Sequence, residues 1–223
     1  MSRPPNFNGL AGLYRWMEFF SFGPWLALTR RTFLGELTDC KRALVLGDGD
    51  GRFSASLLDA NPAIRLEAVD GSGAMLEALV RRAGRNAARV RTEQIDIREW
   101  QAPARAQEFG PPYDLIVTHF FLDCLIESEV RALAGKVREA SSAQAVWVIS
   151  EFRVPQGWFG RWIARPLVAS LYLLFGLLTG LQVRRLPDYA AALREAGFTR
   201  TKQGTRLGGL LVSQLWTVTT ILE

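Results

Sequence analysis

The chain has 223 residues, of which 48% are hydrophobic and 22% charged, and this balance supports one sizeable core and excludes a disordered chain. The net charge is +5, and the basic residues are mostly arginines spread along the sequence. Because the tightest arginine clusters are only pairs, a solvated basic surface explains the charge better than a nucleic acid-binding face.

The N-terminal residues 1–40 are predicted to form a helical cap on a single domain that spans residues 1–223. Apolar residues recur every three to four positions over residues 7–38, which predicts helices. We expect Pro24 to begin a second helix, because proline is favoured in the first turn. The segment lacks the basic-then-apolar pattern of a secretion signal. With Cys40 and Cys124 read as two reduced thiols, we expect a cytoplasmic protein.

From residue 41 short apolar runs alternate with helical periodicity. This alternation indicates an α/β fold, a mostly parallel Rossmann-like sheet with helices on both faces. The last two strands, in TRTKQG and LLVSQLWTV, are separated by a turn too short for a helix, so we expect an antiparallel hairpin. The earlier predicted strands are 43–46, 64–70, 89–96, 113–120 and 145–152; the helices are 51–60, 72–84, 128–140 and 187–198; and 103–112 is a loop.

An apolar insert, residues 153–186, follows the fifth predicted strand. Its residues 167–181 are uncharged but fewer than the roughly 20 that a membrane-spanning helix needs, and they include Gly176 and Gly180. A buried or interfacial helix is therefore favoured over a membrane span.

The loop GDGDG follows the first strand, at the edge where open α/β sheets bind ligands. Its three glycines permit a tight turn and close approach to a ligand, although a plain strand-to-helix turn would also use them. A dinucleotide fingerprint would place its third glycine at position 52, where this chain has Arg52. Asp48 and Asp50 would repel a phosphate but attract a cation.

An acid follows each of the next two strands. Asp70 can accept hydrogen bonds from both hydroxyls of a ribose. Asp96 can accept from the exocyclic amine of adenine, with Ile97 and Trp100 beside the ring. Either acid also fits a turn or a helix cap.

Three titratable residues follow the fourth and fifth strands. His119, the only histidine, ends the fourth strand, with Asp123 four residues later, and Glu151 lies at the end of the fifth. A lone histidine is more often structural than catalytic, but the place of His119 at the predicted ligand edge makes it the candidate general base, ahead of Asp123 and Glu151.

Together these motifs resemble those of the class I S-adenosylmethionine-dependent methyltransferases, over residues 41–217. LVLGDGDG, VDGSGAML and IDIREW are similar to the first three motifs of that family. The resemblance implies a seven-stranded sheet of order 3-2-1-4-5-7-6 whose last strand is antiparallel. It implies S-adenosyl-L-methionine as cofactor and in-line methyl transfer to a small molecule, a reaction that needs no metal.

The resemblance also implies a role for eleven residues. Each would contact one part of the cofactor, and His119 would also be the catalytic residue. They are Tyr14 over the amino-acid end; Gly47, Asp48, Gly49 and Gly51 around methionine and ribose; Asp70 at the ribose hydroxyls; Gly71 and Met75 beside adenine; Asp96 and Ile97 at its amine and ring; and His119 near the methyl group.

The glycine loop departs from the family pattern at one position. Such loops usually carry an acid two residues before the first glycine, where this chain has Val45. We hypothesise that an acid inside the loop, Asp48 rather than Asp50, supplies the negative charge that the cationic cofactor requires.

The insert is predicted to form, with the N-terminal helices, a lid over a hydrophobic small-molecule acceptor. Its aromatic residues include Trp158, Trp162, Tyr172 and Phe175. Its arginine-flanked face could instead contact a membrane surface, and the segment could also be plain core or a dimer contact. We expect a monomer or homodimer.

Three other functions share part of the pattern. A nicotinamide-dependent oxidoreductase would share the sheet and Asp70, but the glycine spacing and the hairpin argue against it. A spermidine-synthase-type aminopropyl transferase would need an acidic polyamine site. A methyltransferase-like binding module without activity is the remaining alternative, and the intact residues that argue against it are Gly47, Gly49, Asp70 and Asp96.

Overall fold

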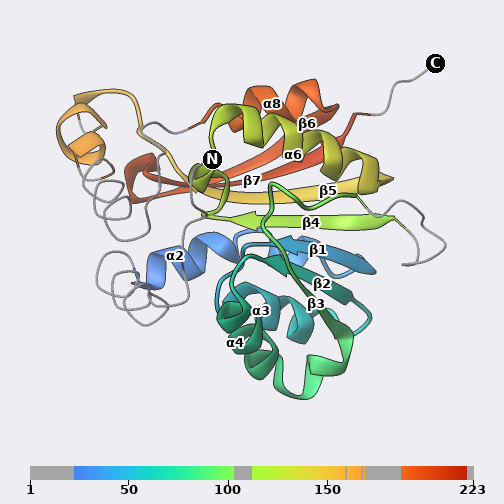
Figure 1. The fold of residues 1–223 in the computed structure, drawn as a ribbon. Coiled ribbons are helices and arrows are strands. Elements are labelled where there is room, and N and C mark those ends of the chain that lie inside the picture. The colour runs from blue at the N-terminus through green and yellow to red at the C-terminus, as the bar shows by residue number, and fades with distance from the viewer. Residues whose placement is uncertain (1–22, 103–111, 159, 167, 169–186, 220–223) are drawn as a thin grey trace.

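The computed structural model describes residues 23–102, 112–158, 160–166, 168 and 187–219. Their seven strands form one sheet of order β3-β2-β1-β4-β5-β7-β6 (Figure 1). β7 runs antiparallel to both β5 and β6, and the remaining pairs are parallel. The predicted strand order and terminal hairpin are confirmed. The strands are β1 Arg42–Leu46, β2 Arg65–Asp70, β3 Val90–Gln94, β4 Tyr113–His119, β5 Ser141–Phe152, β6 Phe198–Arg206 and β7 Leu211–Val218.

Helices cover both faces of the sheet (Figure 1). One face carries α3 and α4, with α2 beside α3, and the other carries α6 and α8. Short 3-10 turns connect several elements, among them η1 Leu34–Glu36, η3 Leu122–Cys124 and η5 Leu207–Gly209. The helices are α2 Gly23–Arg30, α3 Arg52–Ala60, α4 Gly73–Ala83, α6 Glu127–Ala140 and α8 Tyr189–Glu195.

The central strand β4 shows how the two helical layers are held. Leu115 and Val117 pack toward α3 and α4, whereas Ile116 packs into the core beneath α6 and α8, and all three are fully buried. Burying such a side chain contributes about 1.5–3 kcal/mol. The continuous apolar run of this strand follows from its burial on both faces.

Several predicted boundaries differ from the structure. The helix predicted at 187–198 spans only Tyr189–Glu195, and Phe198 already begins β6. In the described part of the predicted helical region 7–38, α2 ends at Arg30. The Thr29 hydroxyl donates to the carbonyl of Trp25 at 2.7 Å, and the Thr32 hydroxyl donates to the carbonyl of Leu28 at 3.3 Å. Such bonds are typical of a bent helix end. β3 ends two residues early, because residues 96–100 form a turn. β5 begins four residues early, at 141, where its backbone pairs with the start of β4.

Some predictions fall on residues outside the described ones. These are Tyr14, the loop residues 103–111 and most of the insert, including Tyr172 and Phe175. Among the helices that the structure describes, none has the length and apolar character needed to cross a bilayer.

Candidate functional site

The predicted site residues leave the sheet at one edge. Leu46, the last residue of β1, pairs with Val69 of β2 and Thr118 of β4, so these three strands end at the same level. The sheet thereby brings to one edge the predicted site residues, which are spread over some 70 residues of the sequence. Gly47 follows β1, whereas Asp70 and His119 are the last residues of β2 and β4. Asp96 lies two residues after Gln94, the end of β3, which pairs with Asp70.

The glycine loop is held in left-handed backbone conformations. Gly47, Gly49 and Gly51 have φ of +67°, +59° and +77°. A Cβ on Gly47 would lie 2.1 Å from the ring of Phe121, and one on Gly51 would lie 2.7 Å from the Cα of Leu79. A Cβ on Gly49 would meet no atom of a described residue within 4 Å. Packing therefore requires two of the glycines, and the open side of the third leaves room for a ligand against the backbone.

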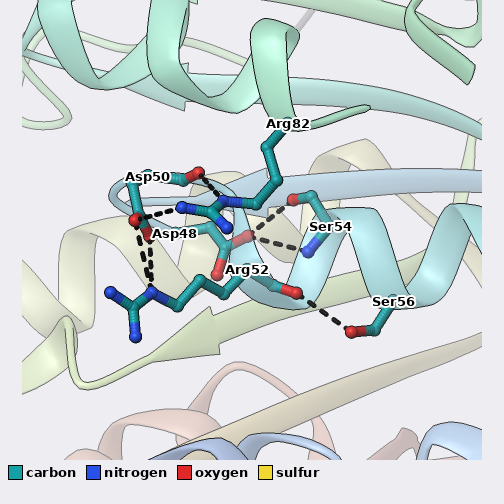
Figure 2. A network of polar contacts seen from close by, with 6 residues as sticks. All are labelled: Asp48, Asp50, Arg52, Ser54, Ser56 and Arg82. Carbon is teal, nitrogen blue, oxygen red and sulfur yellow. Dashed lines mark hydrogen bonds and ion pairs between the residues drawn. The ribbon is translucent and has the colours of Figure 1, made fainter. Parts of the chain in front are cut away.

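Asp48 is the acid of this loop that the protein leaves incompletely paired. Ser54 donates its backbone N–H and its hydroxyl to Oδ2 of Asp48 at 2.8 and 2.7 Å (Figure 2). Oδ1 is buried and has no hydrogen-bond partner among the described residues. Burial raises the pKa of Asp48, while the bonds from Ser54 and the nearby charge of Arg30 oppose that rise. A buried carboxylate oxygen without a partner is costly, so the position fits a ligand that brings a cation or an N–H group.

Asp50 is compensated within the protein. Its carboxylate contacts Nε of Arg52 at 3.1 Å and Nη2 of Arg82 at 2.7 Å, and Arg82 Nε also donates to its backbone carbonyl at 2.9 Å (Figure 2). Two guanidinium groups thus satisfy this acid. The arrangement supports the hypothesis that Asp48, rather than Asp50, faces the ligand.

Asp70 ends β2 beside the loop. Its Oδ1 accepts the backbone N–H of Ser72 at 2.8 Å, and Ser72 in turn caps α4 by accepting from the backbone N–H of Met75 at 3.4 Å, as predicted for a helix N-cap. Burial raises the pKa of Asp70 to about 6, and the charge of Asp48 adds to that rise. Two acids that destabilise each other's ionised forms favour a cationic or hydroxyl-rich ligand at this edge. Gly71 is exposed and Met75 is buried.

Asp96 lies two residues beyond the end of β3, and its carboxylate is already paired with the guanidinium of Arg98. Its carboxylate accepts from the backbone N–H of Arg98 at 3.0 Å and from Nε at 2.9 Å, with Nη2 on its other oxygen. These contacts hold the pKa of Asp96 below its usual range. Ile97 is half-buried, but Trp100 is 1% exposed and packs into the core beneath α6, so the expectation that its ring flanks a ligand is wrong.

His119 is buried among apolar groups. Its ring lies edge-on to that of Phe53, with 4.4 Å between centroids, and neither ring nitrogen has a hydrogen-bond partner among the described residues. Burial and the charge of Arg30 hold the pKa of His119 well below its ordinary value. The imidazole is therefore neutral near pH 7, the form that accepts a proton.

Glu151 positions the loop after β4. Its Oε1 accepts the backbone N–H groups of Phe121 and Leu122 at 3.2 and 2.8 Å, and this turn sets the ring of Phe121 against Gly47. Burial and the neighbouring Asp123 raise the pKa of Glu151 well above its usual range. The shift favours the protonated carboxyl, and its Oε1 is already engaged by two backbone N–H groups, so the contacts of Glu151 serve the turn. In the described part of the chain, no group of three or more acids, histidines or cysteines could hold a metal ion.

Three residues that the sequence did not single out as site residues also shape the edge: Arg30, Ser54 and Phe121. Ser54 lies in the first turn of α3, six residues after Asp48, a position from which it could have been inferred as a partner of the loop. No sequence signal identifies Arg30, which reaches the site from α2. Phe121 lies two residues after His119, and its contact with Gly47 depends on how the loop after β4 folds.

Comparison with known proteins finds one matching family model and several similar folds. Residues 44–146 match a family model described as a methyltransferase domain. A candidate O-methyltransferase from Nostoc punctiforme PCC 73102 is 18% identical with a TM-score of 0.69, over 93% of this chain and 58% of that one. The S-adenosylmethionine-dependent methyltransferase SibL is 21% identical with a TM-score of 0.66, over 99% and 64%. The N-methyltransferase NodS from Bradyrhizobium japonicum WM9 is 14% identical with a TM-score of 0.59, over 87% and 97%.

At these identities the structural likeness is one of fold. This chain spans less than two thirds of the Nostoc protein and of SibL, and nearly the whole of NodS. No curated protein matches it.

Proposed function

We propose that this chain, which carries a class I S-adenosylmethionine-dependent methyltransferase domain, transfers a methyl group to a small-molecule acceptor. The observation that carries the proposal is the buried Oδ1 of Asp48, which no described residue satisfies, beside a glycine loop with an open side. S-adenosylmethionine is the cofactor of this family, and its ammonium and sulfonium supply the positive charge that such an oxygen favours.

Each of the residues at the sheet edge would contact a different part of the cofactor. Asp48 would bind the ammonium, and the backbone around Gly49 would lie against the methionine and ribose. Asp70 keeps Oδ1 on Ser72, which leaves Oδ2 for the ribose hydroxyls. Asp96 would accept from the adenine amine through lone pairs that Arg98 leaves unused, since each carboxylate oxygen accepts more than one hydrogen bond.

Bound S-adenosylmethionine would supply a methyl group that is already activated by its attachment to a sulfonium. A proton on the acceptor nucleophile would have to be accepted by a base. Neutral His119 is our candidate for that base. The remaining work of the protein is alignment and the exclusion of water.

The apolar acceptor, the lid and the cellular location remain predictions. In support of a hydrophobic acceptor, the described part of the insert carries Trp158 and Trp162, which are 71% and 73% exposed and so available to a ligand or to another surface. We keep the cytoplasmic location and a monomer or homodimer as part of the proposal.

The test is calorimetric titration with S-adenosylhomocysteine and, separately, with NAD. We expect binding of the first only. Asp48→Asn should weaken it about tenfold or more, because a hydrogen bond to a charged group contributes about 1.5–3 kcal/mol. Asp39→Asn, at an exposed acid before β1, is the matched control and should bind like the wild type.

Each contrary result has a distinct meaning. Equal affinities of the Asp48 and Asp39 variants would remove the role given to Asp48. Binding of NAD alone would favour the oxidoreductase, and binding of neither cofactor would favour the inactive binding module.

A further inference from the structure

A cavity of about 360 Å³ lies between α2, α3 and the last turn of α4. Four arginines line it: Arg30 and Arg31 from the end of α2, Arg52 from the start of α3, and Arg82 from α4. They come from three separate parts of the sequence, so the concentration of positive charge arises only on folding.

The arginines are only partly compensated. Asp50 contacts Nε of Arg52 and Nη2 of Arg82, but the two Nη nitrogens of Arg52 carry no contact in the network that Figure 2 draws. Arg31 is exposed and makes no ion pair with any described residue. Arg30 is 8% exposed, and its guanidinium lies 5.2 Å from the centroid of the Phe120 ring. The guanidinium of Arg31 and the Nη nitrogens of Arg52 therefore remain as N–H donors for an anion.

The balance of charge around the cavity favours an anion. Arg30 lies near the charge of Asp48, so the excess is counted over the other three arginines, against which stand two acids, Asp50 and Asp59. Asp59 accepts from the side-chain amide of Asn86 at 2.8 Å. These residues leave an excess of about one positive charge, by simple addition. Guanidinium groups match the geometry of phosphate oxygens better than an ammonium does.

The cavity is separate from the edge that the cofactor would occupy. Gly49 and Asp70 are absent from its described lining. Phe53 lies between the two regions: it lines the cavity and also contacts the ring of His119. The loop that holds Asp48 is shared, because Asp50 anchors two of the cavity's arginines.

We propose that this cavity is a binding site for a phosphate group, carried by a small molecule or by a lipid headgroup. The charge-assisted bonds would come from Arg31 and the Nη nitrogens of Arg52, with Arg30 and Arg82 behind them. The proposal does not depend on methyl transfer, since neither Arg31 nor Arg52 is among the residues proposed to contact the cofactor.

The test measures binding of inorganic phosphate by calorimetry at constant ionic strength, and binding to vesicles of phosphatidic acid against vesicles of phosphatidylcholine. Arg31→Gln and Arg52→Gln should each weaken binding about tenfold or more, because each removes a charge-assisted hydrogen bond. Arg81→Gln is the matched control: Arg81 is exposed on α4 beside Arg82 and is paired only with Glu77 among the described residues. Because Arg31 has no ion pair to lose, its variant should also unfold at the wild-type temperature.

The two ligand arms identify the source of the phosphate. Saturable binding of inorganic phosphate that the Arg31 and Arg52 variants lose supports a small-molecule ligand. Binding to phosphatidic acid vesicles alone, lost in the same variants, supports a headgroup. Absence of saturable binding in both arms, or an equal loss in the Arg81 variant, would overturn the proposal, since equal loss indicates diffuse attraction to a basic surface.

Discussion

Replacing Asp70 by asparagine should stabilise the cofactor-free protein while it weakens cofactor binding. Asp70 is held at the end of β2, where burial raises its pKa from 3.8 to about 6. Its ionised form is therefore disfavoured in the folded chain. Asparagine keeps an oxygen for the backbone N–H of Ser72 and carries no charge to desolvate.

The magnitude follows from the two pKa values. A difference of about two pKa units corresponds to about 3 kcal/mol between the ionised and neutral forms. Because Asp70 keeps some contact with solvent, we expect a gain of about 1–3 kcal/mol in the free energy of unfolding at pH 7.5.

The gain should depend on pH with a defined sign. The folded protein binds the Asp70 proton more tightly than the unfolded chain, so the wild type loses stability as pH rises from about 4 through 6. The asparagine variant lacks this loss. Its advantage should therefore be full above pH 7 and should vanish below pH 4.

Urea denaturation of both proteins between pH 4 and 8 measures this difference, and titration with S-adenosylhomocysteine measures the loss of affinity. Asp39→Asn again serves as the exposed control and should change stability by less than about 0.5 kcal/mol. A destabilised Asp70 variant at pH 7.5, or a gain that is the same at every pH, would refute the reasoning.

Two further predictions test the loop and the histidine. Gly51→Ala should lower the free energy of unfolding by about 2 kcal/mol or more, because its Cβ would lie 2.7 Å from the backbone of Leu79 at a positive φ. Gly84→Ala, also at a positive φ but with no described atom near its Cβ, should lower it by only about 1 kcal/mol. Thermal unfolding compares the two variants, and equal losses would show that the contact with Leu79 is relieved. The single histidine of the chain gives one imidazole Cε1–H resonance by NMR, and this resonance should not titrate between pH 8 and 6.5, because burial lowers the pKa of His119; a midpoint near 6.5 would contradict its burial against Phe53.

The strands and the terminal hairpin were open to sequence reasoning because their signals are local, whereas the strand order was what the family resemblance implied. The apolar runs, the glycine loop and the short turn before β7 each lie within a few residues, and the right-handed crossover rule restricts how such units assemble. The positions of Asp70, Asp96 and His119 at strand ends followed from the same periodicity. The resemblance carried by these motifs then indicated the cofactor.

Which of these residues face a ligand depended on packing. The sequence shows two similar acids in the loop, and only the fold brings Arg82, 32 residues away, onto Asp50 and leaves Asp48 with an unused oxygen. The fold likewise buries Trp100 and sets His119 against Phe53. Periodicity indicates which face of an element is apolar, whereas charge compensation and burial at a site depend on side chains from distant segments. The sequence alone therefore predicted the ligand-binding edge of the sheet, and the tertiary structure decided which residues at that edge are paired or buried.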